Sequence, residues 1–302
     1  MVNGVAGRDE AATDRDAAFL SFFAGLGPLR DDPTVTIVDV GAQDLKGEPH
    51  IYSPLTRVWS HRVIGFEPVY DAEVVEKTEF GVRRVLPFAL GDGSEQALNV
   101  TKYSALSSFY TPNRGLRDEC DTPKHFHDIV KTVPMQTRRL DALQLEQADF
   151  IKLDTQGAEP LIVKGGERYV RQTPLVYSET FFIPFYENMP LFDEHLSLFR
   201  SYGFELLDLY PQPRRRAEVR TPGAYPALGS HPGVGRLVGA DALYGQRYLT
   251  GGQPSDEQRL KALKAALLLH FLFHKYDVVA RILELHAGDG AARDYVGMIK
   301  NV

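Results

Sequence analysis

The chain has little of what a secreted, membrane-spanning or disulfide-bonded protein needs. Its 302 residues include one cysteine, Cys120, which permits neither an internal disulfide nor a cysteine-rich zinc cluster and fits a reducing compartment. The longest apolar run, Ala265 to Phe273, is interrupted by His270 and is too short to cross a bilayer. The polar start of the sequence lacks the apolar region of a signal peptide. We therefore expect a cytoplasmic protein with no membrane partner.

The chain also lacks an excess of basic residues. Its formal net charge is -6 at pH 7. Binding to nucleic acid or to an anionic membrane rests on a basic surface, so neither partner is expected. The hydrophobic content of 43% and the charged content of 25% are ordinary for a globular protein. These values favour a small-molecule substrate, and they leave a homodimer open.

Glycines are missing where phosphate-binding motifs require them. The stretch Thr34 to Gln43, TVTIVDVGAQ, predicts a buried parallel strand that ends on Asp39 and Gly41. Ligands of open α/β sheets bind at such strand ends. Counting from Gly41, the next two glycine positions of a dinucleotide-binding loop hold Gln43 and Lys46, and no Walker A ending follows. A cofactor with a cationic amino-acid end and no phosphate suits this loop, and S-adenosylmethionine is the obvious candidate.

A second acid follows the next predicted strand. The segment HRVIGFEPVYDA ends its apolar part on Glu67 and Pro68, about 26 residues after Gly41. A carboxylate at this position is expected to accept both hydroxyls of a ribose, and a helix-capping acid is the alternative. The third strand lies in RRVLPFALGDGSE, where the turn from Ala89 to Asp92 would enclose an adenine ring or form a hairpin turn.

The middle of the chain predicts an insertion and two more parallel strands. Two β-rich segments, at 97–110 and 131–143, are expected to form antiparallel strands between the third and fourth parallel strands. The fourth strand ends on Asp154 and the fifth on Glu179, followed by a proline-started helix over 183–204 and two last strands. Between the inserted strands lie Cys120, His125 and His127, which lack a fourth metal ligand at a recognisable spacing, so no metal site is expected.

The two ends of the chain predict helices. Residues 1–13 are expected to be disordered, and Asp14 to cap a short helix whose phenylalanines cover one face of the sheet. Near the other end, Ser255 and Gln258 form a capping box that begins a helical pair, whose second helix runs from Asp277 to His286. The sequence thus divides into 1–33, a catalytic domain over 34–250, and a C-terminal helical extension over 251–302.

Several motifs, taken in order, resemble those of the FkbM-type methyltransferases. They are IVDVGAQ, GFEP, FALGDGSE, TRRLDAL, DFIKLDTQGAEPLIVKGG, LVYSETFF and GADALY. The resemblance covers roughly residues 34–245, and its most specific part is the Lys-x-Asp-x-x-Gly-x-Glu run from Lys152 to Glu159. It implies a class I, Rossmann-like, doubly wound α/β sheet and O-methylation of a hydroxyl on a sugar, polyketide or other secondary metabolite. The chain departs from the family at Gln43 to Lys46, where relatives commonly have Asn and a further glycine.

The resemblance also implies roles for individual residues. Asp39, Gly41 and Ala42 would hold the methionyl end of S-adenosylmethionine, and Glu67 with Pro68 the ribose. The adenine and the remaining cofactor contacts would fall to Leu90, Gly91, Asp92, Ser107, Ser108 and Asp154. The candidates for a catalytic base are Asp154, Glu179 and His61, in that order. Glu159 and Glu179 would orient the acceptor or a lid, with Tyr186 as a wall, although Glu159 is equally explained as a first-turn helix acid.

Three alternatives remain beside O-methylation. A nicotinamide oxidoreductase shares the fold but needs the missing glycines. A non-catalytic Rossmann-like binding protein would account for the altered turn after Gly41. A carboxyl methyltransferase that forms an ester would suit the arginines at 214–216, which a solvated loop also explains.

Overall fold

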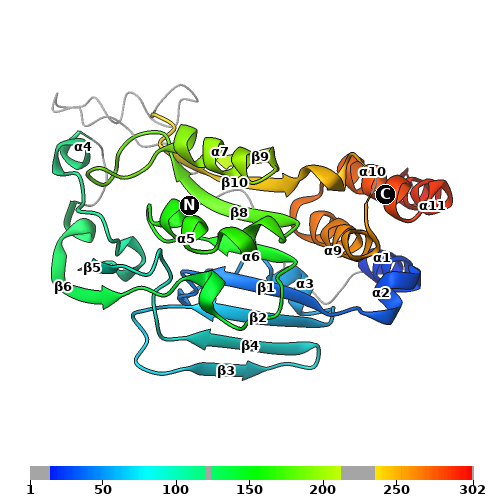
Figure 1. Cartoon of the computed structure of the whole chain (residues 1–302), viewed down its shortest axis with the longest axis horizontal. Helices are drawn as coiled ribbons and strands as arrows, with labels where there is room; N and C mark the ends of the chain where they lie inside the picture. The colour runs from blue at the N-terminus through cyan, green and yellow to red at the C-terminus, as the bar shows by residue number, and fades with distance from the viewer. Residues whose placement is uncertain (1–13, 120–123, 212–234, 253, 301–302) are drawn as a thin grey trace.

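The computed structural model describes residues 14–119, 124–211, 235–252 and 254–300. The predictions for residues 1–13, for Cys120 and for the arginines at 214–216 therefore lie outside the described residues. Within them, an eight-stranded sheet has the order β3-β4-β2-β1-β7-β8-β10-β9 (Figure 1). Its strands are β1 (Val35–Val40), β2 (His61–Phe66), β3 (Val74–Lys77), β4 (Gly81–Leu86), β7 (Phe150–Leu153), β8 (Leu175–Phe181), β9 (Phe204–Pro211) and β10 (Gly239–Gln246).

The centre of this sheet is parallel. β4, β2, β1, β7 and β8 run in the same direction, whereas β3 and β10 are antiparallel to their neighbours. All six residues of β1 are buried, because both faces of the sheet are covered, and this explains its nearly continuous apolar sequence. The pairing of Val40 with Phe66 and with Leu153 brings the chain after β1 beside the chain after β2 and β7. The expected mixed α/β fold with a mostly parallel sheet is therefore present.

Between β4 and β7 the chain forms a small separate sheet. β5 (Glu95–Thr101) and β6 (Ile129–Gln136) pair in antiparallel fashion. The short 3-10 helix η1 (Ser104–Leu106) follows β5, and α4 (Arg114–Asp118) and η2 (Lys124–His127) precede β6. In Figure 1 this insertion lies at the left, where the parallel strands end.

One face of the sheet is covered by helices that follow β7 and β8. These are α5 (Glu159–Gly165), α6 (Glu167–Arg171) and α7 (Phe192–Ser201). Their buried residues, among them Ile162, Val170 and Phe199, form one core with Val38, Val40 and other side chains of this face. The predicted helix over 183–204 begins only at Phe192, because Phe185, Tyr186 and Met189 pack into a separate cluster.

The other face is covered from the C-terminal end of the chain. Residues Ala262 to Phe273 of α9 (Asp256–Phe273) are all buried, and the ring of Phe273 lies 5.9 Å from that of Phe150 and 5.4 Å from that of Tyr177. The short helix α3 (Ser53–Thr56) packs on the same side, and β3 stands where a helix between β2 and β4 would be usual. The capping box at Ser255 is confirmed.

The first and last helices of the described residues pack together in one helical lobe, at the right of Figure 1. It combines α1 (Asp14–Gly25) and α2 (Gly27–Asp31) with α9, α10 (Tyr276–His286) and α11 (Asp289–Lys300). The predicted role of the first helix is wrong in part, since Phe19 and Phe23 pack chiefly against His270 and Tyr295 of the C-terminal helices. The predicted helical pair corresponds to α9 and α10, and a third helix, α11, follows them. Gly288 joins α10 to α11 through a left-handed backbone conformation (φ 95°).

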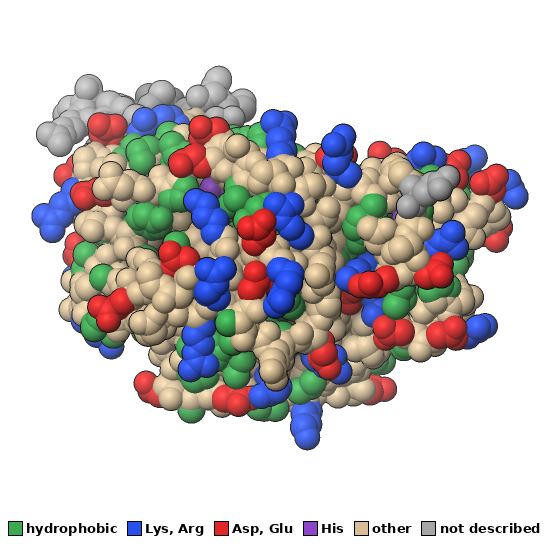
Figure 2. Space-filling view, viewed as in Figure 1, with side chains coloured by type: hydrophobic (Ala, Val, Ile, Leu, Met, Phe, Trp, Pro, Cys, Tyr) green, Lys and Arg blue, Asp and Glu red, His purple; other side chains and the backbone are tan. Residues whose placement is uncertain are grey.

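Charged side chains of both signs are distributed over the surface. Acidic and basic side chains are interspersed over the face drawn in Figure 2, as the counts of 34 Lys and Arg and 40 Asp and Glu suggest. Among the described residues, no helix combines the length and the apolar character that a membrane span requires.

Candidate cofactor site

A cavity lies at the carboxyl ends of the central parallel strands. The loops after β1, β2, β4 and β7 contribute Gly41, Glu67, Leu90 and Asp154 to its lining, and the segment after β5 contributes Ser107. Its volume is about 200 Å³. The strand ends, which are distant in sequence, thus meet where open α/β sheets bind their ligands.

Gly41 permits the closest approach of two of these loops. Its φ of 79° lies in the left-handed region, and a Cβ atom at this position would lie 1.9 Å from the carbonyl oxygen of Asp154. Any side chain would therefore push the loop after β1 away from the loop after β7. The glycine of the Asp-x-Gly motif is required for the shape of the cavity.

Glu67 lies directly after β2 and is 6% exposed at the cavity. Its Oε1 accepts a hydrogen bond from the Val69 N–H at 3.1 Å, and no described residue donates to Oε2. Burial raises the pKa of this carboxyl to about 7, an effect that the Val69 N–H opposes. Phe88, Ala89 and Leu90 form an apolar wall of the same cavity. A carboxylate with a free acceptor beside an apolar wall suits a nucleoside.

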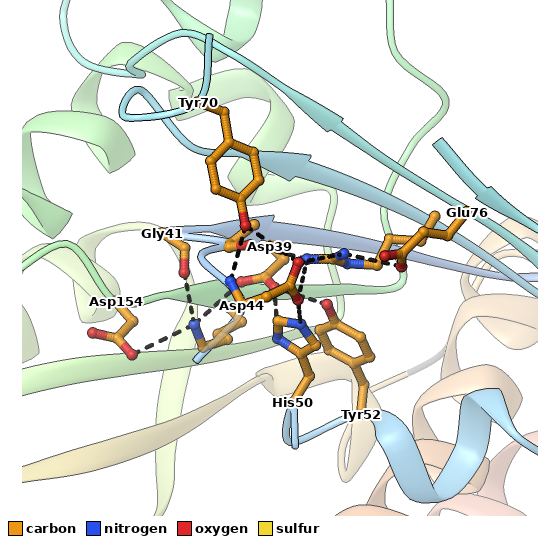
Figure 3. A network of polar contacts seen from close by, with 11 residues as sticks. Asp39, Gly41, Asp44, His50, Tyr52, Tyr70, Glu76 and Asp154 are labelled. Carbon is orange, nitrogen blue, oxygen red and sulfur yellow. Dashed lines mark hydrogen bonds and ion pairs between the residues drawn. The ribbon is translucent and has the colours of Figure 1, made fainter. Parts of the chain in front are cut away.

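Asp39 lies elsewhere than predicted. It is inside β1, so its side chain points to a face of the sheet, and it is fully buried and absent from the cavity lining. Figure 3 shows its partners: the Tyr52 hydroxyl donates to Oδ2 at 2.8 Å, and Lys152 Nζ donates to Oδ1 at 3.2 Å. The expected direct contact of Asp39 with a cofactor is therefore not supported, because both oxygens are engaged within the protein.

Lys152 joins this buried acid to the cavity. Its ammonium group lies 3.2 Å from Asp39 Oδ1, 3.3 Å from the Gly41 carbonyl oxygen and 3.4 Å from Asp154 Oδ2. Burial lowers the pKa of Lys152, but the carboxylates of Asp39 and Asp154 raise it more strongly, so the net shift is upward. Lys152 is consequently a cation that joins the loops after β1 and β7 through two hydrogen bonds and an ion pair.

The QDLK segment that departs from the family pattern supplies a second part of this network. Asp44 accepts from Arg83 at 3.0 Å and from the Tyr70 hydroxyl at 3.2 Å, and His50 Nε2 lies 2.9 Å from its Oδ1 (Figure 3). Arg83 also bonds the Ala42 carbonyl oxygen at 2.9 Å and Glu76 at 3.0 Å. These bonds tie the irregular loop after β1 to β3 and β4.

Gln156 is the centre of a third group of hydrogen bonds, and no pattern in the sequence predicted a role for it. It has a left-handed backbone (φ 57°), lines the cavity and bonds three other segments. Its Nε2 donates to Glu179 at 2.7 Å, its Oε1 accepts from the Tyr186 hydroxyl at 2.9 Å, and its carbonyl oxygen accepts from Ser108 Oγ at 2.7 Å. Glu179 lies within β8 and does not line the cavity, but it accepts from Gln156, which does.

Glu159 stabilises the backbone beside the cavity. It is fully buried at the start of α5, where its carboxylate accepts from the N–H groups of Thr155 at 2.7 Å and Gly157 at 3.0 Å. Burial raises its pKa. The interpretation as a helix-start acid fits this geometry, since Glu159 stabilises the turn that carries Asp154 and Gln156 without lining the cavity.

The remaining predicted site residues divide between the cavity and other positions. Pro68, Leu90, Ser107, Ser108 and Asp154 line the cavity, whereas Ala42, Gly91 and Asp92 do not. Gly91 packs instead against the end of α5, where a Cβ on Gly165 would lie 1.8 Å from the Gly91 carbonyl oxygen. Asp92 accepts hydrogen bonds from Ser94 in a local turn.

His61 is removed from the catalytic candidates by its position. It is the first residue of β2 and pairs with Val35, so it lies at the opposite end of the strand from Glu67, about 20 Å away at the usual rise per residue. It is buried, and its ring nitrogen Nδ1 lies 3.0 Å from the Trp59 carbonyl oxygen.

The charged side chains that line the cavity fit a nucleoside with a cationic reacting group. Three carboxylates line it, those of Glu48, Glu67 and Asp154, together with the single lysine Lys152 among the described residues. A comparison with protein-family models matches residues 39–206, more than half of the chain, to the family described as Methyltransferase FkbM domain. No curated protein and no solved structure matches the chain.

Proposed function

We propose that this chain, which belongs to the FkbM methyltransferase family, transfers a methyl group from S-adenosylmethionine to a hydroxyl of a small molecule such as a sugar, a polyketide or another secondary metabolite. Membership in the family makes the chain a methyltransferase. The identity of the methyl donor and of the acceptor hydroxyl is our inference from the cavity.

Glu67 carries the proposal for the donor. Its Oε2 has no donor among the described residues, and ribose hydroxyls supply donors of the right kind. A buried carboxyl with a raised pKa also gains from a ligand that hydrogen-bonds its charged form. S-adenosylmethionine, when bound, supplies a methyl group on a sulfonium that is already activated for displacement. The carboxylates of the cavity suit that positive charge.

The chain itself then has to align the acceptor and remove a proton. Asp154 is the candidate base, because its side chain is 44% exposed at the cavity while Lys152 holds its Oδ2. The ion pair with Lys152 and the close contact with Gly41 restrict the position of Asp154, which serves alignment. Glu179 is proposed as a positioning residue, because it does not line the cavity and bonds Gln156, which does.

Titration calorimetry with S-adenosylmethionine and S-adenosylhomocysteine tests the donor. We expect wild-type protein to bind both, and Glu67→Gln to weaken both by roughly a hundredfold, since charge-assisted hydrogen bonds to the ribose are lost. Glu95→Gln, which changes an exposed acid at the start of β5, is the matched control and should bind like wild type. Unchanged affinity in Glu67→Gln would rule out the ribose assignment, and binding of NAD alone would rule out the donor.

The product distinguishes the remaining alternatives. A methyl ether survives mild base, whereas a methyl ester is hydrolysed and releases methanol. Transfer of label from methyl-labelled S-adenosylmethionine to a base-stable product supports O-methylation of a hydroxyl. A base-labile product would identify a carboxyl methyltransferase, and tight donor binding without transfer to any acceptor of a broad hydroxyl panel would favour a binding protein.

A further inference from the structure

Most side-chain hydrogen-bond donors that line the cavity are committed to partners within the protein. Lys152 donates to Asp39 and to the Gly41 carbonyl oxygen and pairs with Asp154, Ser108 donates to the Gln156 carbonyl oxygen, Thr155 Oγ1 donates to Glu159, and one N–H of Gln156 donates to Glu179. Both ring nitrogens of His50 face carboxylates. Lys152, Ser108 and Thr155 cannot receive an anionic ligand without giving up a contact that shapes the site, whereas Gln156 keeps a second N–H.

Besides that N–H of Gln156, three neutral side chains of the cavity have donors without a partner that shapes the site. Gln43 Nε2 donates to Ser104 Oγ at 2.9 Å, Ser104 Oγ donates to Gln43 Oε1 at 3.3 Å, and neither side chain bonds any other described residue. Ser107 Oγ accepts from the Thr101 N–H at 3.2 Å, so its O–H stays available as a donor. All three side chains line the cavity and are half-buried. These three side chains thus belong to the loop after β1 and to the segment around η1.

We propose that Gln43, Ser104 and Ser107 hold the carboxylate of the amino-acid end of S-adenosylmethionine. This inference rests on the proposed function. The donor combines a ribose, a sulfonium and an amino-acid end, and only the last bears an anion that needs hydrogen-bond donors. Gln43 and Ser104 exchange their two mutual hydrogen bonds for bonds to that anion, so the protein loses neutral hydrogen bonds and gains charge-assisted ones.

This assignment gives the inserted β5–β6 segment and the altered QDLK turn one shared role. Gln43 belongs to that turn, and Ser104 lies 61 residues further along the chain, directly after the inserted strand β5. The Asp44 contacts with Arg83 and Tyr70 hold the turn in place (Figure 3), and this keeps the side chain of Gln43 within hydrogen-bond distance of Ser104. Side-chain donors replace the backbone N–H groups that a glycine-rich turn would offer.

Two ligands that differ only at the amino-acid end test the assignment. S-adenosylhomocysteine carries that end, whereas 5'-methylthioadenosine has the same adenosine and thioether without it. We expect Gln43→Ala and Ser104→Ala to lower the affinity for S-adenosylhomocysteine by about ten- to a hundredfold. The affinity for 5'-methylthioadenosine should change by less than about threefold. Ser107→Ala should show the same selectivity with a smaller loss. Titration calorimetry on each variant measures both affinities.

The controls separate this inference from the proposed function. Gln96→Ala removes a chemically matched pair outside the cavity, in which Gln96 Nε2 donates to Ser94 Oγ at 2.8 Å, and should change neither affinity. Glu67→Gln should lower the affinity for both ligands to a similar extent. Equal losses for both ligands in the Gln43 and Ser104 variants, or no loss for S-adenosylhomocysteine, would overturn the carboxylate assignment alone. Failure of wild-type protein to bind either ligand would overturn the proposed function as well.

Discussion

Asp39 and Glu67 belong to neighbouring strands and stand near the same edge of the sheet, yet their surroundings are opposite. Asp39 is the fifth residue of β1, where its side chain points to a covered face and meets Lys152 and Tyr52. Glu67 is the first residue after β2, where its side chain reaches the cavity and keeps Oε2 available. A shift of two positions relative to the strand end separates an acid that holds the protein together from one that is suited to a ligand.

Removal of Asp39 should have the largest effect on stability. Asp39→Ala leaves Lys152 largely buried beside a half-exposed Asp154, and we expect the free energy of unfolding to fall by about 3 kcal/mol. Urea denaturation at pH 7 measures this change. The double variant Asp39→Ala/Lys152→Met should recover much of the loss, because no unpaired charge is left. A loss below about 1 kcal/mol would mean that the two acids are not as different as the geometry indicates.

The second-largest expected effect on stability is a dependence on pH that arises from Glu67. Its pKa is raised from 4.5 to about 7 in the folded protein, so the folded state binds the proton more tightly than the unfolded state. The resulting stability is complete below pH 4.5, decreases as the pH rises towards 7 and is lost above it. Relative to Glu67→Gln, wild-type protein should therefore lose about 2 kcal/mol of unfolding free energy between pH 5 and pH 8. Parallel curves for the two proteins would contradict the raised pKa.

The hydroxyl of Tyr52 should contribute less. Tyr52→Phe removes a hydrogen bond of 2.8 Å to the buried Asp39 carboxylate, which we expect to cost about 1.5 kcal/mol in thermal or urea unfolding. Tyr103→Phe removes the hydroxyl of a 39%-exposed tyrosine and serves as the control, with an expected change within about 0.5 kcal/mol. Equal effects of the two substitutions would show that the Asp39 network adds nothing at this contact.

Asp154 should affect stability least and turnover most. Its carboxylate is half-exposed, so Asp154→Asn should change the unfolding free energy by less than about 0.5 kcal/mol and the affinity for S-adenosylhomocysteine only slightly. If it is the base, the substitution should lower the rate of methyl transfer roughly a hundredfold. Initial rates of S-adenosylhomocysteine formation with an accepted hydroxyl substrate give this value. A variant that turns over at the wild-type rate would leave base catalysis to another group.

Much of the sheet could be predicted from local sequence. The run VTIVDV between Pro33 and Gly41 predicts β1, and the acid followed by Pro68 marks the end of β2, since both patterns depend only on neighbouring residues. The same patterns did not place the ends of β8 or the start of α7, because apolar residues at 180–191 continue the strand and then pack into their own cluster. Local periodicity does not distinguish these outcomes.

The sequence alone determined which acids and glycines stand near the strand ends, because strand ends follow from short-range patterns of burial and turn residues. Only the tertiary structure decided what each of them does. Asp39 meets Lys152 across 113 positions, and Gln43 meets Ser104 across 61, because parallel strands that are distant in the chain end side by side. A side chain's hydrogen-bond partners and its burial determine its charge and its availability to a ligand, and both arise only when those strands have assembled.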